Sequence, residues 1–226
     1  MAGTSTSELI HIVKSLGIDA YFLGVFDKNF PGFLDVHKVS YAIVNTGDYV
    51  SGGMHWIAFA YDPNGSLFYM FDPFGWSNKD LYKHYKFQYD RMLKHTALQG
   101  NRCIRLLKSV EAVQCLCSAA CGLFCCLFLA SFYHYRYSPL CNNPIIDIVT
   151  GVPHSVLNSP RGIKITHCNQ KKLYDWLYVN CLYFRKNARE IKNNTRINAV
   201  TAHYTVYCLS FFFNQEKASS SLSTSC

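Results

Sequence analysis

Between Ala112 and Tyr135 the chain contains no Lys, Arg, Asp or Glu, and this stretch constrains the fold more than any other. An uncharged run of that length either crosses a bilayer or lies in a protein core. Four polar residues interrupt it: Gln114, Ser118, Ser131 and His134. Its strongly apolar part, Ala119–Tyr133, falls short of the roughly 20 residues that a membrane helix needs. We therefore expect a buried core helix over this part, and no membrane partner.

The 226-residue chain is 50% hydrophobic, 15% aromatic and only 16% charged. A disordered scaffold has the opposite balance, so most of this chain should fold. Its length suffices for one sizeable core, or for a core with a small lobe. The C-terminal part differs, because the aromatic run 211–213 is followed by the Ser-rich end 219–225. We expect a folded domain over 1–196 and an extension over 197–226 whose Ser-rich end is disordered.

The net charge of +8 is concentrated in two blocks. Residues 79–108 carry eight basic and two acidic side chains, and residues 161–196 carry nine basic and two acidic side chains. Brought to one face, these blocks would bind a polyanion such as nucleic acid. The same charges are also consistent with solvated helix faces, so charge alone leaves both interpretations open.

The chain has 11 cysteines, an odd number. Its N-terminus lacks a basic segment followed by an apolar stretch, so we expect no secretory signal. Disulfides should then be rare, and most thiols should be free. Cys115, Cys117, Cys121 and Cys125 lie close together, but their spacing lacks the two separated pairs typical of structural zinc sites. We therefore expect no metal.

Helix and strand signals are distributed along the rest of the chain. Ser5-Thr6-Ser7-Glu8 is a capping box, which predicts a helix that ends near Gly17. The other elements expected are a strand over 39–44, a hairpin of 55–61 and 67–71, helical structure over 78–95, and a helix over 170–183.

The hairpin is the clearest local signal, because its two apolar runs flank the turn sequence Asp62-Pro63-Asn64-Gly65. In a two-residue turn centred on the middle of that sequence, His55 and Asp72 are direct cross-strand partners, with Cβ atoms about 5 Å apart. An imidazole beside a carboxylate forms the base and the orienting group of a nucleophilic triad. Taken alone, such a pair is better explained as a structural hydrogen bond.

Cys121 is the candidate nucleophile. If Ser118 caps the following helix, this thiol lies in the first turn, where free N–H groups and the helix dipole stabilise a thiolate. Gly122 would let a substrate backbone approach closely. Gln114 offers an amide N–H that would form an oxyanion hole with the backbone N–H of Cys121. Position alone, however, favours a buried core thiol.

Several segments around these residues resemble the adenovirus endopeptidases, a family of viral cysteine proteases. They are Tyr21-Phe22-Leu23-Gly24, Phe30-Pro31-Gly32-Phe33, Gly52-Gly53-Met54-His55-Trp56, Phe71-Asp72-Pro73-Phe74-Gly75, Ser118-Ala119-Ala120-Cys121-Gly122-Leu123-Phe124-Cys125-Cys126, Thr150-Gly151-Val152-Pro153 and Leu157-Asn158-Ser159-Pro160. They follow in order over about residues 8–195, so the resemblance covers most of the chain.

The resemblance implies an α+β fold with a papain-like core, in which helices pack on a central mixed sheet and the site residues follow in the order His, Asp, Cys. His55 would be the general base, Asp72 its orienting acid, Cys121 the nucleophile and Gln114 an oxyanion donor. It also implies cleavage of viral precursor proteins at Gly-containing sites during virion maturation, in the virion and the host cell nucleus.

Two cofactors are further implications of the resemblance. One is an activating peptide from the C-terminus of a minor capsid protein precursor, which adds a strand and forms a disulfide with the cysteine that corresponds to Cys103. The other is DNA, bound without sequence preference, which suits the two basic blocks.

The chain departs from the family in three places, one of which is the tail after about residue 197, which has no counterpart. Asp72 stands where many members have Glu, so it contacts His55 either directly or through water. Cys115-Leu116-Cys117 replaces a Gly-Pro-Asn type of linker and adds two thiols near the site. Two other functions stay open: a protease that removes ubiquitin-like proteins from conjugates, and a non-catalytic virion protein that packages DNA.

Overall fold

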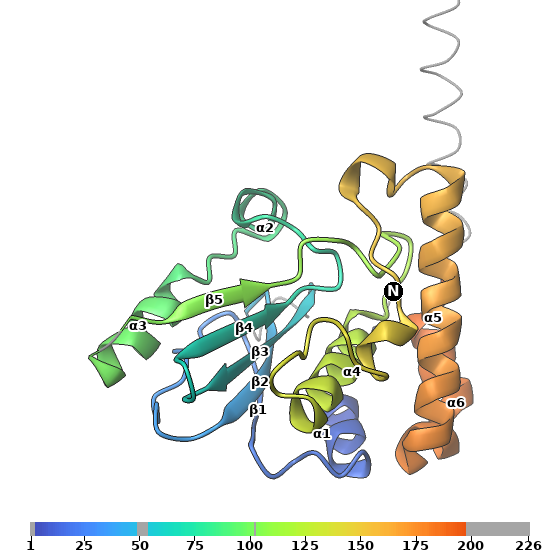
Figure 1. Cartoon of the computed structure of the whole chain (residues 1–226). Coiled ribbons are helices and arrows are strands. Elements are labelled where there is room, and N and C mark those ends of the chain that lie inside the picture. Colours follow the sequence, from blue (N-terminus) through green and yellow to red (C-terminus); the bar gives the residue numbers. More distant parts are fainter. Residues whose placement is uncertain (1–2, 49–53, 102, 198–226) are drawn as a thin grey trace, which may run out of the picture.

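A computed structural model describes residues 3–48, 54–101 and 103–197 (Figure 1). Its centre is a five-stranded sheet in the order β1-β2-β3-β4-β5. The two outer strand pairs are parallel and the two inner pairs are antiparallel. The strands are β1 (Phe22–Phe26), β2 (Ser40–Asn45), β3 (Trp56–Asp62), β4 (Leu67–Phe71) and β5 (Arg105–Lys108). The expected α+β class and central mixed sheet are therefore confirmed.

Both faces of the sheet are covered. On one face, α4 (Cys121–His134) packs on β3 and α1 (Thr6–Ser15) contacts α4. On the other face, α2 (Asn78–Tyr85) and α3 (Asp90–Gly100) contribute to a second apolar cluster. The remaining helices are α5 (Pro160–Asn180), α6 (Leu182–Thr195) and the short 3-10 helices η2 (Ile146–Ile148) and η3 (His154–Val156). Every residue of β2 is buried, as expected of a central strand covered on both sides.

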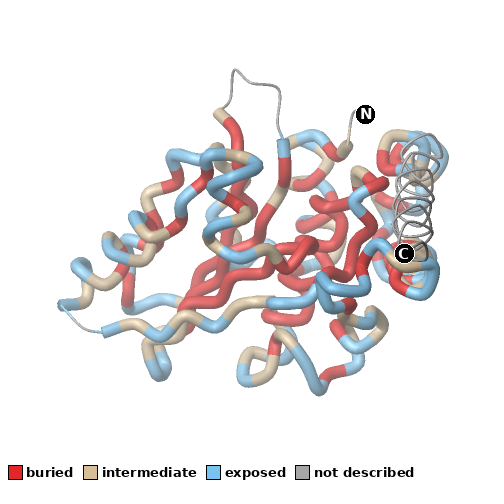
Figure 2. Tube along the Cα trace, turned by 90° about the horizontal axis from the view of Figure 1, so that it is seen from above, coloured by how far each residue is buried: buried red, intermediate tan, exposed pale blue. Residues whose placement is uncertain are grey.

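α4 accounts for the long uncharged stretch. All of its residues from Cys121 to Phe132 are buried. A helix that is apolar on all sides is stable in water only inside a core, so the expected core helix is confirmed. Seen from above, buried residues gather in the middle of the molecule and exposed residues lie on the outer helices and loops (Figure 2). Among the described residues, none of the helices combines the length and apolarity that a membrane crossing requires.

β3 and β4 form the expected hairpin, but the predicted two-residue turn is wrong. Asp62 pairs with Leu67, so the loop has two more residues than the turn chemistry suggested. Gly65 has a φ of +89° and Ser66 a φ of +52°. Because both residues take left-handed conformations, the chain continues to turn before β4 begins.

Two segments show how well local sequence signals predict helix boundaries. The capping box at Ser5 is confirmed, because its side chain accepts from the backbone of Glu8 and the Glu8 side chain accepts from the backbone of Ser5. The segment predicted as helical over 78–95 is largely helical and is divided between α2 and α3. Lys86 takes a left-handed conformation with a φ of +54° and ends the first of them.

The helix predicted over 170–183 begins much earlier, at Pro160. Ser159 caps it, and Pro suits the first helical position because its missing N–H has no partner there. The extended conformation of Cys181 then separates α5 from α6. Strands β1 and β5 were not predicted, because short edge strands carry little periodic signal.

The two basic blocks belong to different parts of the fold. Residues 79–108 form α2, α3 and β5, whereas residues 161–196 form most of α5 and α6. In Figure 1, α3 lies at one end of the molecule, and α5 and α6 lie at the other. α2 and β5, the rest of the first block, lie between these two ends, so the basic segments are spread along the length of the molecule.

The C-terminal extension meets the described structure at Ile197, which forms an isolated bridge with Ser118. Residues 198–226 lie outside the described residues. The disordered Ser-rich end and the domain boundary after residue 196 therefore stay predictions.

Candidate active site

His55 and Asp72 lie at the open end of the hairpin, directly before β3 and directly after β4. Nε2 of His55 and Oδ1 of Asp72 are 2.7 Å apart, and both side chains are only 1% exposed. The predicted contact is therefore present, and it is direct. The predicted register is wrong, because continuing the pairing of Ala58 with Phe71 toward the open end would place His55 opposite residue 74 rather than 72. The reach of the two side chains closes that offset.

The Asp72 carboxylate is held by the loop that follows β4. Its Oδ1 accepts a hydrogen bond from the backbone N–H of Phe74 at 2.9 Å, and its Oδ2 accepts one from Trp76 at 3.1 Å. The Ser109 hydroxyl accepts from the backbone N–H of Asp72 and donates to its carbonyl, both at 2.9 Å. These bonds satisfy both carboxylate oxygens and keep Oδ1 directed at His55.

Aromatic rings enclose the His55 imidazole. Phe74 stacks on it with a centroid distance of 4.6 Å, and Tyr85 stacks with it at 5.5 Å. Tyr85 comes from the end of α2. Tyr85 was not predicted as a site residue, because nothing in its local pattern distinguishes it from the other aromatic residues of this segment.

The electrostatics of the pair favour a protonated imidazole. Burial alone would lower the pKa of His55, because it disfavours the charged ring. The charge and hydrogen bond of Asp72, together with the Cys121 side chain, outweigh burial and raise this pKa to about 9. The raised pKa favours the protonated ring when it faces these two partners.

Cys121 is the first residue of α4, and it is 8% exposed. The helix begins two residues later than predicted, and Ser118 does not cap it. Instead, the Ser118 hydroxyl accepts from the N–H of Ala120 at 3.3 Å, within the loop before the helix. Because Ala120 has no side-chain oxygen to cap the helix, the thiol lies in a first turn without a side-chain cap.

Nδ1 of His55 is the ring nitrogen left for the thiol. It is buried, and it has no hydrogen-bond partner among the described residues. Interaction with the Cys121 side chain nevertheless contributes to the raised pKa of His55, so the two groups are neighbours. A loose contact is usual for catalytic pairs without substrate, since such hydrogen bonds tighten in the bound complex.

Gly122 has a different role from the predicted one. A Cβ at this position would lie 2.2 Å from Oγ1 of Thr4 and 2.8 Å from Cδ2 of Leu9. The absence of a side chain at Gly122 therefore makes room for the chain's own N-terminal segment and α1, not for a substrate.

Gln114 is fully buried, and its side-chain Nε2 donates to the carbonyl of Ser118 at 2.8 Å. Its Oε1 has no hydrogen-bond partner among the described residues. The bond to Ser118 ties the amide group to the loop that leads to Cys121. Nε2 also donates to the Ser118 hydroxyl over a longer 3.4 Å contact, so its second N–H must leave that contact to bind a ligand.

A cavity of about 730 Å³ brings these groups together. His55, Gln114 and Cys121 line it, along with Phe74 and Tyr85. Asp72 lies behind the imidazole, where it contacts His55 but not the cavity. A thiol, an imidazole held by a carboxylate and an amide donor around one open space can perform acyl transfer.

Comparison with known proteins decides the family. The chain matches the sequence model of the adenovirus endoprotease over residues 22–199.

This chain belongs to the adenovirus endoprotease family.

Proteases of several adenoviruses show how closely the chain follows this family. The protease of frog adenovirus 1 is 62% identical over 202 residues, which cover 89% of this chain and 99% of that protein. The protease of avian adenovirus 8 is 51% identical over 90% of this chain and 100% of its own length. The protease of human adenovirus A serotype 12 is 45% identical over 85% of this chain and 95% of its own. The chain is therefore a viral cysteine endopeptidase.

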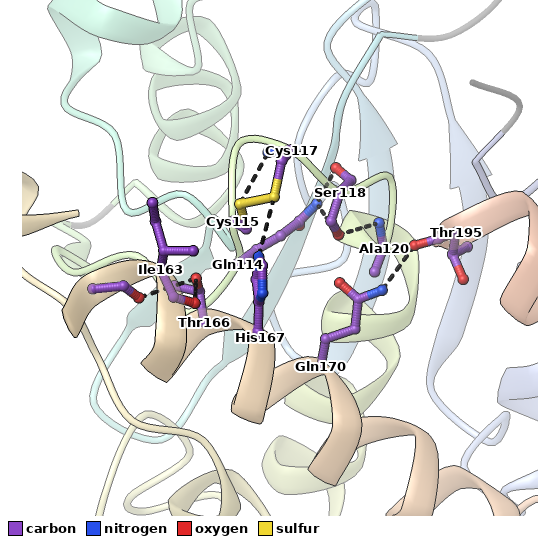
Figure 3. Close-up of a disulfide and its surroundings, with 11 residues drawn as sticks. Gln114, Cys115, Cys117, Ser118, Ala120, Ile163, Thr166, His167, Gln170 and Thr195 are labelled. Carbon is purple, nitrogen blue, oxygen red and sulfur yellow. Dashed lines mark hydrogen bonds between the residues drawn. A yellow bond between two sulfur atoms is a disulfide. The ribbon is translucent and has the colours of Figure 1, made fainter. Parts of the chain in front are cut away.

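This endoprotease contains a disulfide that the sequence analysis did not predict. Cys115 and Cys117 are bonded to each other in the linker that joins Gln114 to Cys121 (Figure 3). The expectation of mostly free thiols holds for the other cysteines of the described residues, which are Cys103, Cys121, Cys125, Cys126, Cys141, Cys168 and Cys181. Disulfides were expected to be rare, and the bond between Cys115 and Cys117 is the one disulfide among the described residues.

Cys103 of this endoprotease lies away from the cavity. Its side chain is exposed and free, two residues before β5. β5 is an edge strand, since it pairs only with β4 in the described sheet. An accessible thiol is therefore placed beside an unpaired strand edge.

Proposed function

We propose that this endoprotease cleaves viral precursor proteins at Gly-containing sites, with Cys121 as nucleophile, His55 as general base and Asp72 as orienting acid. The observation that carries the proposal is the 2.7 Å contact that holds His55 at the wall of a cavity also lined by Cys121. We also infer a papain-like core, because the three groups follow in the order His, Asp, Cys and the thiol begins a buried helix.

The reaction proceeds by acyl transfer. The Cys121 thiolate attacks the carbonyl carbon of the scissile bond, a C–S bond forms, and negative charge develops on the carbonyl oxygen. The His55 imidazolium protonates the leaving amine as the C–N bond breaks, which leaves a thioester. His55 then takes a proton from water, which attacks the thioester; the C–S bond breaks, and the acid product and the Cys121 thiolate are released beside the His55 imidazolium.

Gln114 stabilises the developing oxyanion through its second amide N–H, together with the backbone N–H of Cys121. We expect Gln114→Ala to lower kcat by about 10- to 1,000-fold with little change in KM, because the lost donor acts mainly in the transition state. Steady-state kinetics on a Gly-Gly-containing peptide measures this effect.

The matched control for that experiment is Gln170→Ala. Gln170 is another buried glutamine whose Nε2 donates to a backbone carbonyl, that of Thr195, at 2.8 Å. It does not line the cavity. Equal losses of kcat in the two variants would show that Gln114 acts through the fold and would remove it from the oxyanion site.

An activating peptide from a minor capsid protein precursor is the first proposed cofactor. The exposed thiol of Cys103 and the edge of β5 support this proposal, because an added strand there gains backbone hydrogen bonds and a covalent link. We expect Cys103→Ala to raise the peptide concentration needed for half-maximal activation by about tenfold or more, because the covalent link is lost.

Activity titrations, with non-reducing gels for the cross-linked product, measure the effect of Cys103→Ala. Cys141→Ala is the control, since Cys141 is also exposed and free. Activation of the Cys103 variant at the same peptide concentration as wild type would contradict a covalent link at this position.

DNA is the second proposed cofactor, and the virion and host cell nucleus are the proposed sites of action. The basic residues of α2, α3 and β5, and those of α5 and α6, support binding to phosphates without sequence preference. Because α3 lies at one end of the molecule and α5 and α6 lie at the other, we infer that a duplex contacting all three helices runs across the protein.

Peptidase assays on two substrate classes test the proposed function. Viral precursor sequences with Gly-containing sites should be cleaved, and the rate should rise with added activating peptide and DNA. Ubiquitin-like proteins with Gly-Gly tails should be cleaved poorly. Preferential cleavage of the ubiquitin-like tails would instead establish a deconjugating protease.

A further inference from the structure

The disulfide in the Gln114–Cys121 linker has a third neighbour that can bind a metal. Nε2 of His167 lies 3.4 Å from Sγ of Cys117 (Figure 3). The donor atoms of Cys115, Cys117 and His167 all lie within 4.8 Å of one another. Both cysteines are buried and His167 is partly exposed, so the cluster lies at the edge of the protein interior.

The two halves of this cluster are held together independently of the disulfide. Asn169, two residues after His167 on α5, donates to the carbonyl of Val113 at 2.9 Å. Its Oδ1 accepts from the N–H of Thr150 at 2.9 Å. These bonds fix α5 against the start of the linker, so the imidazole stays near Cys115 and Cys117 when the disulfide is broken.

The donors suit a zinc ion once the cysteines are reduced. Two thiolates and one imidazole are preferred zinc ligands, and tetrahedral zinc has Zn–S near 2.3 Å and Zn–N near 2.0–2.1 Å. Those lengths require a sulfur–nitrogen separation of about 3.6 Å. The 3.4 Å between Cys117 and His167 already approaches it. The two sulfurs would move apart to about 3.8 Å, which reduction of the disulfide permits.

A backbone N–H also stabilises negative charge on the Cys115 sulfur. The N–H of Cys117 donates to Sγ of Cys115 at 3.2 Å, a type of hydrogen bond that stabilises a thiolate ligand. The residues Cys115-Leu116-Cys117 therefore provide two sulfur ligands and an N–H donor within three consecutive positions.

We propose that Cys115, Cys117 and His167 form a redox-controlled zinc site. A dithiol or phosphine reductant supplies the two electrons that break the disulfide, two protons complete the thiols, and the reductant is oxidised. One Zn²⁺ then displaces both thiol protons and binds the two sulfurs, Nε2 of His167 and one water. The structure shows the oxidised state of the site. This inference does not depend on the proposed peptidase mechanism.

Cobalt titration of the full-length protein tests the zinc site. Co²⁺ serves as the probe because its bonds to thiolates absorb visibly, and the Cys121→Ser background removes the thiol beside His55 as a competitor. After anaerobic reduction, we expect one equivalent of Co²⁺ to give sulfur-to-cobalt absorption that Zn²⁺ abolishes. The oxidised protein should give no such absorption.

Variants at the cluster make the test specific. Cys117→Ser and His167→Ala should each weaken Co²⁺ binding by about tenfold or more. Cys168→Ser should leave it unchanged, although this exposed thiol is adjacent to His167 in sequence. Unchanged binding in either of the first two variants, or loss of binding in the third, would overturn the assignment.

Alkylation of the reduced parent protein gives a readout that needs no substitution in the cluster. Zn²⁺ should slow alkylation of Cys115 and Cys117, measured by mass spectrometry of peptides. It should leave the exposed Cys141 and Cys168 as reactive as before. Equal rates with and without Zn²⁺ at the two linker cysteines would show that no metal binds there.

Discussion

Replacing Cys121 with alanine should lower kcat/KM for a Gly-Gly-containing peptide by about four orders of magnitude or more. The reason is chemical, since no thioester forms without the sulfur and the remaining groups only bind and polarise the substrate. The variant should fold normally, because Cys121 occupies the first position of α4 and its removal leaves the other core residues in place. Peptide hydrolysis, with thermal unfolding measured alongside, checks both parts.

Cys125→Ala is the matched control for Cys121→Ala. This thiol lies one turn further along α4 and is completely buried, and burial holds its pKa well above the usual value. It should therefore be inert as a nucleophile. We expect this variant to lose stability but to keep its turnover number. If activity survived in Cys121→Ala and disappeared in Cys125→Ala, the nucleophile would be Cys125 and the assignment of Cys121 would be wrong.

Asp72→Asn should lower kcat/KM by about 100-fold or more and should move the alkaline limit of activity to lower pH. Wild-type activity should fall as pH rises through about 9, because the His55 imidazolium loses its proton there. Asn carries no charge to offset the burial of the ring, so the pKa of His55 falls in the variant. Complete pH–rate profiles of both proteins measure the shift.

The same titration affects stability with a definite sign. Because folding raises the pKa of His55 from 6.5 to about 9, its contribution to stability is fully present below about 6.5 and is lost as pH rises through 9. Asp62→Asn is the control for both effects, since Asp62 is buried at the far end of the same hairpin. An alkaline limit that stays in place in Asp72→Asn would contradict the orienting role.

Strong local signals in the sequence predicted the elements that hold the candidate site. The uncharged stretch predicted α4, and the two apolar runs predicted β3 and β4. The predicted register of β3 against β4 was wrong by two residues because Gly65 and Ser66 extend the turn. The turn sequence does not reveal this extension. His55 and Asp72 still meet, because side chains at the open end of a hairpin can reach across such an offset.

Other features of the site depend on contacts between distant segments. Tyr85 stacks on His55 only because the chain after β4 returns α2 to the end of the sheet. His167 approaches Cys117 only because α5 packs beside the linker, fifty positions further along the chain. Helix boundaries failed for a related reason, since Ser118 had the right residue type for a cap but its hydroxyl bonds within the preceding loop.

Labelling with a thiol-reactive peptide probe tests the central claim most directly. The probe carries a Gly-Gly sequence and an electrophile at the scissile position, and the modified cysteines are identified by mass spectrometry. Exposure alone favours Cys103, Cys141 and Cys168 over Cys121, which is only 8% exposed. We predict rapid and selective labelling at Cys121, accelerated by activating peptide and DNA and lost in His55→Ala. Labelling that follows exposure, with Cys121 unmodified, would contradict the assignment of Cys121 as the nucleophile.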